Sequence, residues 1–270
     1  MLRTHDPPGS RAQVHGAREV PGAGKVTAPE TMDALLFDCD GVLAETERDG
    51  HRVAFNRAFA ELGLQTQWPV ERYGQLLAVA GGKERLRRHF AEVGWPAGWP
   101  DTDRLIAELH RRKTEIFQDM VRRGEMPLRT GVARLIVAAI DAGMPVAVCS
   151  TANAATVRAI LETGLGASRA GRIAVFAGDL VPAKKPDPAI YRLALAQLGV
   201  RADRTVAVED SRNGLLAAKG AELHCIVTPS HYTAQEPFSE ADLVVTDLGD
   251  PPAAAVTLAD CRALCVGAQG

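Results

Sequence analysis

The chain has 270 residues, of which 46% are hydrophobic and 24% are charged, and its formal net charge is −2. This length is sufficient for one large hydrophobic core and a smaller second domain, and the near-neutral charge lacks the basic excess of nucleic-acid-binding proteins. The apolar runs are far shorter than a membrane span requires, so we expect neither a nucleic acid nor a membrane as partner.

The first 31 residues are rich in proline and glycine and show no apolar periodicity. Such a segment buries too little apolar surface to fold, so 1–31 is predicted to be a disordered N-terminal extension. It also lacks the apolar core of a secretory signal. We interpret it as an over-long start or a cloned leader, which leaves the protein in the cytoplasm. The alternative is a transit peptide, which would place the protein in a plastid.

The segment 35–42 reads Leu-Leu-Phe-Asp-Cys-Asp-Gly-Val. A short apolar run before turn residues is typical of a buried parallel strand, and open α/β sheets bind their ligands at the carboxyl ends of such strands. Asp38 and Asp40 would repel each other there unless a cation lay between them. Mg²⁺ together with a phosphate suits these hard oxygen ligands. The alternative is a plain strand followed by an Asp-Gly turn.

Asp38 is separated from the next polar strand end, at Ser150, by far more than the roughly 30 residues that a βα crossover needs. The excess predicts an inserted domain. Its apolar residues recur every three or four positions over 51–62, 84–93 and 103–121, which indicates amphipathic helices. We therefore predict an α-helical cap over 46–124, which would act as a lid that excludes water from the site.

After the cap, predicted helices and strands alternate. The helices are expected at 132–142, 154–163, 188–198 and 213–219, and each precedes a strand, the strands ending at Cys149, Phe176, Glu209 and Val227. A short strand over 243–245 would follow. This order predicts a Rossmann-like parallel sheet covered on both faces, formed by 32–45 and 125–250 and followed by a C-terminal tail over 251–270. Three of the five cysteines fall in these strands, which favours reduced thiols in a cytosol-like compartment.

Three later motifs would complement the two aspartates. They are Ser150 and Thr151 after one apolar run, Lys185 directly before a proline, and Glu209 and Asp210 after another apolar run. Phosphoryl transfer depends mainly on positioning and on charge stabilisation. A carboxylate can attack phosphorus, a hydroxyl and a lysine can hold the phosphate oxygens, and acidic groups can bind the metal.

This ordered set of motifs resembles the haloacid dehalogenase-like phosphatase superfamily over about residues 33–247. The resemblance implies that Asp38 is a nucleophile that forms an aspartyl-phosphate and that Asp40 is the general acid/base. It also implies that Ser150 and Lys185 bind the transferring phosphoryl group.

The same resemblance implies a Mg²⁺ site. Asp210 would ligate the ion together with Asp38 and the carbonyl of Asp40, and Glu209 would assist. Val42 stands where many relatives carry threonine, a common variant that leaves this chemistry unchanged.

Within the cap, the segments 43–47, 51–52, 54–56, 73–77 and 81–85 resemble the CbbY-type branch of the superfamily, as does 178–181 in the core. These phosphatases act on xylulose 1,5-bisphosphate and belong to the accessory set of the Calvin cycle. Relative to the bacterial pattern, one residue is inserted near Asp49 and Gly50. The resemblance implies a bisphosphate as substrate.

A bisphosphate needs a second phosphate site, which we place in the cap. Gly81 and Gly82 before a helix expose backbone N–H groups, and Lys83 and Arg85 add positive charge; the alternative is a junction with solvated basic side chains. Glu47 and His51 could bind sugar hydroxyls at the domain junction. The predicted substrate-binding set is Glu47, His51, Lys83, Arg85, Thr151 and Asn153.

We therefore expect a Mg²⁺-dependent sugar-phosphate phosphatase that acts on xylulose 1,5-bisphosphate, an inhibitory by-product of ribulose-bisphosphate carboxylase. The expected partner is this small molecule, and the expected state is a monomer. A β-phosphoglucomutase-like phosphomutase is the alternative enzyme, because it would share every core motif. A non-catalytic sugar-phosphate-binding protein is a third hypothesis, which the intact pair of Asp38 and Asp40 disfavours.

Overall fold

The computed structural model describes residues 32–79 and 81–266. Its strands are β1 (Ala34–Phe37), β2 (Val146–Ser150), β3 (Ala174–Ala177), β4 (Thr205–Glu209), β5 (His224–Val227) and β6 (Leu243–Val244). Its helices are η1 (Thr46–His51), α1 (Arg52–Glu61), α2 (Val70–Leu76), α3 (Gly82–Val93), α4 (Thr102–Arg122), α5 (Val132–Asp141), α6 (Ala154–Leu165), α7 (Ala167–Ala170), α8 (Ala189–Leu198), η2 (Ala202–Arg204), α9 (Arg212–Gly220) and α10 (Leu258–Val266). The extension predicted over 1–31 lies outside the described residues.

The described strands form one parallel sheet in the order β3-β2-β1-β4-β5-β6. In the centre of the sheet, Leu35 of β1 is in register with Val146 of β2 and with Val206 of β4. After β1, the chain forms β2 and β3 on one side of β1 and then β4, β5 and β6 on the other side. The direction in which strands are added therefore reverses beside β1. Sheets of this kind bind ligands outside the carboxyl ends of the strands at that point. The predicted parallel α/β sheet is confirmed, and its order places a site beyond β1 and β4.

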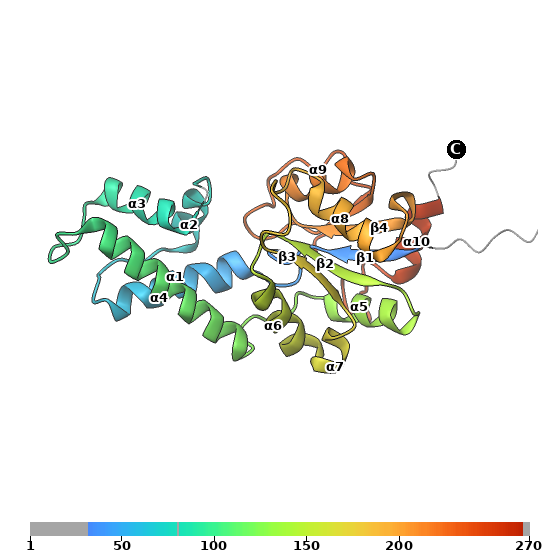
Figure 1. Cartoon of the computed structure of the whole chain (residues 1–270), viewed down its shortest axis with the longest axis horizontal. Helices are drawn as coiled ribbons and strands as arrows, with labels where there is room; N and C mark the ends of the chain where they lie inside the picture. The colour runs from blue at the N-terminus through green and yellow to red at the C-terminus, as the bar shows by residue number, and fades with distance from the viewer. Residues whose placement is uncertain (1–31, 80, 267–270) are drawn as a thin grey trace, which may run out of the picture. The chain divides into compact units, whose positions relative to one another are not determined.

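Side chains alternate along β1, so each face of the sheet has its own core. Leu35 and Phe37 pack in the cluster that includes residues of α5 and α6, whereas Ala34 and Leu36 pack in the cluster of α8 and α9. Figure 1 shows α5 and α6 on one side of the sheet and α8 and α9 on the other. Because both faces are covered, the strands appear in the sequence as continuous apolar runs.

The helices η1 and α1 to α4, which we call the cap helices, lie between β1 and α5 in the sequence and form a group beyond the end of β1 (Figure 1). Helix α1 packs against α4, and large aromatic side chains such as Phe55 and Trp68 are buried among the cap helices. The helices predicted over 51–62, 84–93 and 103–121 correspond to α1, α3 and α4. Helix α2 was not predicted.

Helix η1 is a π-helical turn of 6 residues that continues directly into α1. A π-helical turn closes i→i+5 hydrogen bonds and so holds one more residue than an α-helical turn. The residues Asp49 and Gly50, where the sequence analysis expects an inserted residue, lie in this turn. Gly50 is buried there, and a Cβ on it would lie 2.6 Å from the ring of Phe117 and 2.8 Å from the sulfur of Met126. The close packing of η1 on α4 therefore requires glycine at this position.

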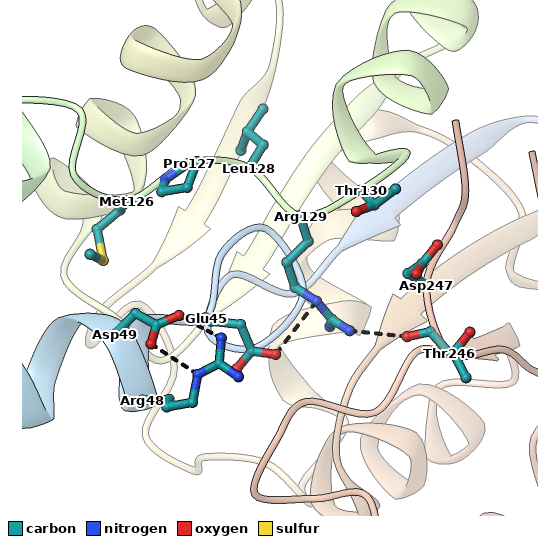
Figure 2. Close-up of a pocket in the computed structure, with 10 residues that line it drawn as sticks. All are labelled: Glu45, Arg48, Asp49, Met126, Pro127, Leu128, Arg129, Thr130, Thr246 and Asp247. Atoms are coloured by element: carbon teal, nitrogen blue, oxygen red, sulfur yellow. Dashed lines mark hydrogen bonds and ion pairs between the residues drawn. The ribbon is translucent and has the colours of Figure 1, made fainter. Parts of the chain in front are cut away.

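The linker over 123–131 leads from the cap helices back to the core and is held by Arg129. This guanidinium donates to the carbonyl oxygens of Thr228 (2.9 Å) and Pro229 (3.0 Å) and also to that of Gly41. It lies 3.7 Å from the carboxylate of Glu45, and Figure 2 shows the two side chains pointing toward each other beside a cavity of about 300 Å³. The linker is therefore tied to the loops that follow β1 and β5.

Residues 258–266, which we expected to belong to a C-terminal tail, form helix α10 and pack on the core. Cys261 is buried, as is Val256 before the helix, and α10 contacts β4 and α5. Leu258, Cys261 and Leu264 recur three residues apart and give the helix one apolar side. The alanine- and proline-rich composition before the helix concealed this short periodicity.

Each cysteine of the chain is a free thiol, and Cys39, Cys149 and Cys225, which were predicted in or beside buried strands, are buried. Within the described ranges, the structure contains no helix that is both long enough and apolar enough to cross a membrane.

Candidate active site

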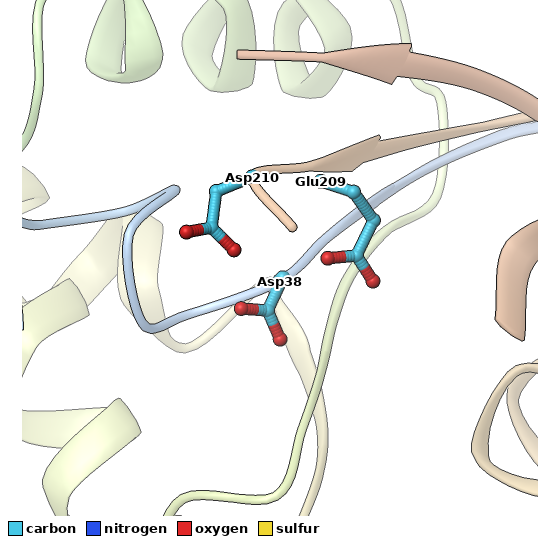
Figure 3. A group of neighbouring side chains, drawn as sticks. All are labelled: Asp38, Glu209 and Asp210. Atoms are coloured by element: carbon cyan, nitrogen blue, oxygen red, sulfur yellow. The ribbon is translucent and has the colours of Figure 1, made fainter. Parts of the chain in front are cut away.

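Three acidic side chains meet at the carboxyl ends of the two central strands. Asp38 directly follows β1, Glu209 is the last residue of β4, and Asp210 follows Glu209. Each offers a carboxylate oxygen, and these oxygens lie within 4.8 Å of one another (Figure 3). All three residues are buried. Parallel pairing of β1 with β4 brings together motifs that are far apart in the sequence, as predicted for this edge of the sheet.

Lys185 neutralises part of this negative charge. Its Nζ donates to Asp38 Oδ1 (2.6 Å), to Glu209 Oε1 (2.7 Å) and to the carbonyl oxygen of Cys149 (2.9 Å). Burial lowers the pKa of Lys185, but the charges of Asp38 and Glu209 outweigh burial and hold this pKa above its ordinary value. Lys185 is therefore protonated at neutral pH, and one ammonium group faces several carboxylates.

Glu209 is fixed by its surroundings. The hydroxyl of Tyr191 donates to Glu209 Oε1, and a Cβ on Gly214 would lie 1.9 Å from Glu209 Oε2, so only glycine leaves room for the carboxylate. Burial raises the pKa of Glu209 to about 7, although the charge of Lys185 opposes it. Within the described part of the chain, Glu209 Oε2 is buried without a hydrogen-bond partner. Burying such an oxygen lowers the free energy of unfolding unless a cation or a hydrogen-bond donor binds to it.

Asp40 lines the same cavity as this group and contacts a cap helix. Thr46, the first residue of η1, donates a 2.6 Å hydrogen bond from Oγ1 to Asp40 Oδ1. Burial and, less strongly, the charge of Asp38 raise the pKa of Asp40 to about 7, although the hydrogen bond from Thr46 opposes them. A carboxyl group with such a pKa can hold or release a proton near neutral pH. Thr46 was not among the predicted residues.

Two cavities lie between the cap helices and the core. The larger, about 430 Å³, is lined on the core side by residues that include Asp38 and Asp40. The second, about 330 Å³, is lined on the cap side by residues that include His51 and Lys113. Asp40 and Thr151 line both cavities. The two spaces therefore adjoin beside Asp40, the residue predicted to transfer the proton.

Residues 32–222 match the family model described as haloacid dehalogenase-like hydrolase. The chain belongs to this hydrolase family. A CBBY-like protein of Arabidopsis thaliana is 52% identical over 235 residues, which cover 86% of this chain and 74% of the relative. Protein CbbY of Cereibacter sphaeroides is 46% identical over 221 residues, which cover 81% of this chain and 94% of the relative. The predicted CbbY-type membership is confirmed, and with it the predicted phosphatase class.

Solved structures of haloacid dehalogenase-like hydrolases have the same fold. The crystal structure of a mutant CbbY from Rhodobacter sphaeroides in complex with xylulose-(1,5)bisphosphate superposes with a TM-score of 0.69 and 44% identity, covering 85% of this chain and 99% of that one. A putative β-phosphoglucomutase from Thermotoga maritima has a TM-score of 0.64 at 23% identity, covering 79% of this chain and 94% of that one. The second comparison shows the shared fold alone.

The acidic group suits the divalent metal ion that hydrolases of this family generally use. Burial raises the pKa of Asp210 well above its ordinary value, and the charge of Asp38 raises it further. With Lys185 as the counter-charge, the acidic group therefore tends to hold protons, which a bound divalent cation would displace, and Glu209 Oε2 lacks a partner among the described residues. Hard oxygen ligands in excess of one positive charge fit Mg²⁺ or a similar ion.

Among the other residues predicted in the core, Ser150 is buried at the end of β2, and its Oγ accepts a hydrogen bond from Ala152 N (3.1 Å). Thr151 lines both cavities, and Asn153 lines the second one. Asn153 also accepts from Ala155 N (2.9 Å), which begins helix α6. Ser150 itself lines neither of the two cavities that we describe.

The residues predicted in the cap fall into two groups. Glu47 lines the larger cavity and accepts a 2.5 Å hydrogen bond from the hydroxyl of Tyr73. Arg85 donates to the same hydroxyl (3.2 Å) and lies 3.8 Å from the Glu47 carboxylate, so it helps to hold Glu47 in place. Lys83 is exposed in the first turn of α3, near His110. Neither Lys83 nor Arg85 lines the two cavities described above.

Lys113 of α4 is a site residue that the sequence analysis missed. Its Nζ lies 3.0 Å from Nδ1 of His51 and over the rings of Phe55 (5.0 Å) and Phe117 (5.4 Å). Burial lowers the pKa of Lys113 to about 8. The basic run around Lys113 resembles a solvated helix face. Lys113 is four residues before buried Phe117, so both lie on the apolar side of α4. This spacing was the sequence signal that could have identified Lys113 as a site residue.

Proposed function

We propose that this enzyme is a Mg²⁺-dependent phosphatase that removes one phosphate from xylulose 1,5-bisphosphate, an inhibitory by-product of ribulose-bisphosphate carboxylase. The observation that carries the proposal is the pair of adjoining cavities, with Asp38 and Lys185 in one and Lys113 in the other. Positive groups on both sides of Asp40 suit a molecule with a phosphate at each end. The relative from Rhodobacter sphaeroides forms a complex with xylulose-(1,5)bisphosphate.

In this proposal, an Oδ of Asp38 attacks phosphorus and the ester P–O bond breaks. Asp40 gives its proton to the departing sugar oxygen, and Thr46 holds the Asp40 carboxyl toward the cavity. Lys185 and Ser150 hold the phosphoryl oxygens. Water then hydrolyses the aspartyl-phosphate, and Asp40 takes up the proton of that water. Mg²⁺, held by Asp38, Asp210 and the Asp40 carbonyl, would reduce the repulsion between the phosphate and the carboxylates.

A panel of sugar phosphates, each incubated with enzyme and Mg²⁺ and monitored for free phosphate, tests the proposed substrate. We expect the highest kcat/KM for xylulose 1,5-bisphosphate, with one phosphate released per molecule. Isomerisation of a sugar phosphate without release would indicate a phosphomutase instead. Tight binding without turnover of any member of the panel would indicate a binding protein.

The first prediction concerns the metal. Asp210→Ala is expected to weaken Mg²⁺ binding strongly, because it removes a buried carboxylate of the acidic group. The Mg²⁺ concentration for half-maximal activity should rise, and the increase in melting temperature that Mg²⁺ gives the wild type should disappear. Asp103→Ala is a matched control, since that side chain is 83% exposed on α4. Activity that survives EDTA, with no metal found by elemental analysis, would contradict the prediction.

The second prediction concerns the remote phosphate. Lys113→Met is expected to lower kcat/KM for xylulose 1,5-bisphosphate about 10- to 150-fold, which corresponds to a charge-assisted contact of roughly 1.5–3 kcal/mol. Lys113 lines the second cavity, whereas Lys83, the residue that the sequence favours, is exposed and lines neither cavity. Part of the loss should fall on kcat, because binding at a remote group can close the lid. p-Nitrophenyl phosphate lacks the second phosphate and should be hydrolysed as before.

Lys83→Ala, an exposed position in the first turn of α3, serves as the comparison for Lys113→Met. Equal losses of Lys113→Met on both substrates would place Lys113 in the chemistry of the core or in folding. A selective loss for Lys83→Ala and none for Lys113→Met would place the remote phosphate at the start of α3, as the sequence favours.

A further inference from the structure

Helix α2 carries a glycine in its interior, Gly74, although alanine is more favourable at such positions. A Cβ on Gly74 would lie 3.0 Å from Cε1 and 3.1 Å from Cδ1 of Tyr232. These distances are shorter than an ordinary van der Waals contact. The glycine therefore allows the ring of Tyr232, which belongs to the loop after β5, to approach the backbone of a cap helix. No step of the proposed chemistry uses either residue.

A second contact joins the same two elements. The hydroxyl of Tyr232 donates a 3.1 Å hydrogen bond to the carbonyl oxygen of Val70, the first residue of α2. The ring of Tyr232 lies 6.0 Å from that of Tyr73, and Tyr232 lines the larger cavity. Through this one side chain, a loop of the core contacts the first and middle parts of α2.

The loop that carries Tyr232 also holds Asp210. Thr233 Oγ1 donates to the backbone carbonyl oxygen of Asp210 (2.7 Å) and accepts from Ser230 N (2.9 Å). Thr233 Oγ1 also lies 3.4 Å from Asp210 Oδ2. On the other side, His231 N donates to Glu45 Oε1 (3.3 Å), and Glu45 directly precedes η1. The residues 230–233 therefore contact the acidic group, the residue before η1 and helix α2.

We propose that Tyr232 is a positioning residue: its packing against Gly74 and its bond to Val70 fix the loop 230–233 and thereby the Asp210 carboxylate when the cap helices lie over the site. Tyr232 acts through this loop and not on the reacting atoms. The proposal rests on the proposed function in one respect, namely that a bound sugar bisphosphate favours this placement of the cap helices. The contact of Tyr232 with α2 then determines both where the cap helices lie and how the Asp210 carboxylate is held.

A double-mutant cycle between Gly74 and Tyr232 tests the proposal. In the wild-type background, Gly74→Ala should displace the Tyr232 ring and lower kcat/KM for the best sugar phosphate about 5- to 100-fold, mainly through kcat, as expected for residues in contact. In the Tyr232→Ala background, the same change should cause no further loss and should raise the melting temperature, because alanine favours the helix. Tyr232→Phe keeps the ring and loses the bond to Val70, so its loss should be about 2- to 10-fold.

Hydrogen exchange of the substrate-free enzyme gives a second readout, which does not depend on turnover and reports whether Tyr232 couples the loop to α2. Tyr232→Ala should speed amide exchange both in 228–233 and in α2. Phe238→Ala is the control, because it removes an aromatic ring that packs with the cluster of α8 and α9 and should leave exchange in α2 unchanged. Additive losses in the cycle, or unchanged exchange in 228–233 after Tyr232→Ala, would overturn the proposal. The exchange experiment needs no substrate, so it remains decisive even if xylulose 1,5-bisphosphate is not hydrolysed.

Discussion

Replacing Asp38 by asparagine is expected to lower kcat by several orders of magnitude while the fold persists. Asparagine has nearly the shape of aspartate and can still accept the hydrogen bond from Lys185, which lies 2.6 Å from Asp38 Oδ1. Its amide, however, is neither a nucleophile nor a good metal ligand. Single-turnover measurements with acid quench should show no phosphorylated protein for Asp38→Asn and a transient phosphoprotein for the wild type.

Asp33→Asn is the matched control for this experiment. Asp33 precedes β1 at its other end and pairs with Arg204 (3.0 Å), away from the cavities. Turnover of this variant should equal that of the wild type. If Asp38→Asn retained a tenth of the wild-type turnover, the covalent mechanism would be wrong. Asp40→Asn should also be inactive, because it leaves the departing oxygen without its proton.

The largest effect on stability is expected for Lys185→Met. Lys185 is buried between Asp38 and Glu209, and methionine fills a similar volume without the charge. Removing one partner of a buried charge pair costs about 3–5 kcal/mol, because the remaining carboxylates lose their counter-charge. At pH 8 in metal-free buffer, urea unfolding should therefore reach its midpoint at a much lower concentration, and turnover with Mg²⁺ should be lost.

The neighbouring lysine provides the comparison for Lys185→Met. The side chain of Lys184 is 62% exposed and lies 3.9 Å from Asp179, which is itself on the surface. Lys184→Met should change the free energy of unfolding by less than about 0.5 kcal/mol. A Lys185→Met variant that unfolds at the wild-type urea concentration would show that the carboxylates are neutral or otherwise paired in the folded protein.

Elements with strong periodicity or with clear boundaries were predicted to within one or two residues. The helix expected over 103–121 is α4 (Thr102–Arg122), and the strand expected to end at Glu209 is β4. Helix α2 was missed because it has only 7 residues and contains Gly74, which local propensity disfavours. Its place is set by tertiary contacts, among them the one with Tyr232.

The same distinction applies to the site. Asp38, Lys185 and Asp210 could be predicted because the carboxyl ends of parallel strands lie at one edge of the sheet. Polar residues that follow different strands are therefore expected to lie close together. Thr46 and Lys113 could not be predicted in the same way. Their roles depend on how the cap helices lie over the sheet, and hydrophobic patterns give the existence of a helix but not its placement over a distant loop.

The π-helical turn η1 contains six residues, and we expect this number to influence which groups the site presents to a substrate. Three of its side chains make contacts near the site: Thr46 contacts Asp40 of the core, whereas Glu47 contacts Tyr73 and His51 contacts Lys113 within the cap. Each residue advances an α-helix by about 100°, so a chain one residue shorter here would rotate Thr46 and Glu47 by that angle relative to α1. Two homologous enzymes with identical side chains at every aligned position could then present different groups to the sugar, solely because of one deletion.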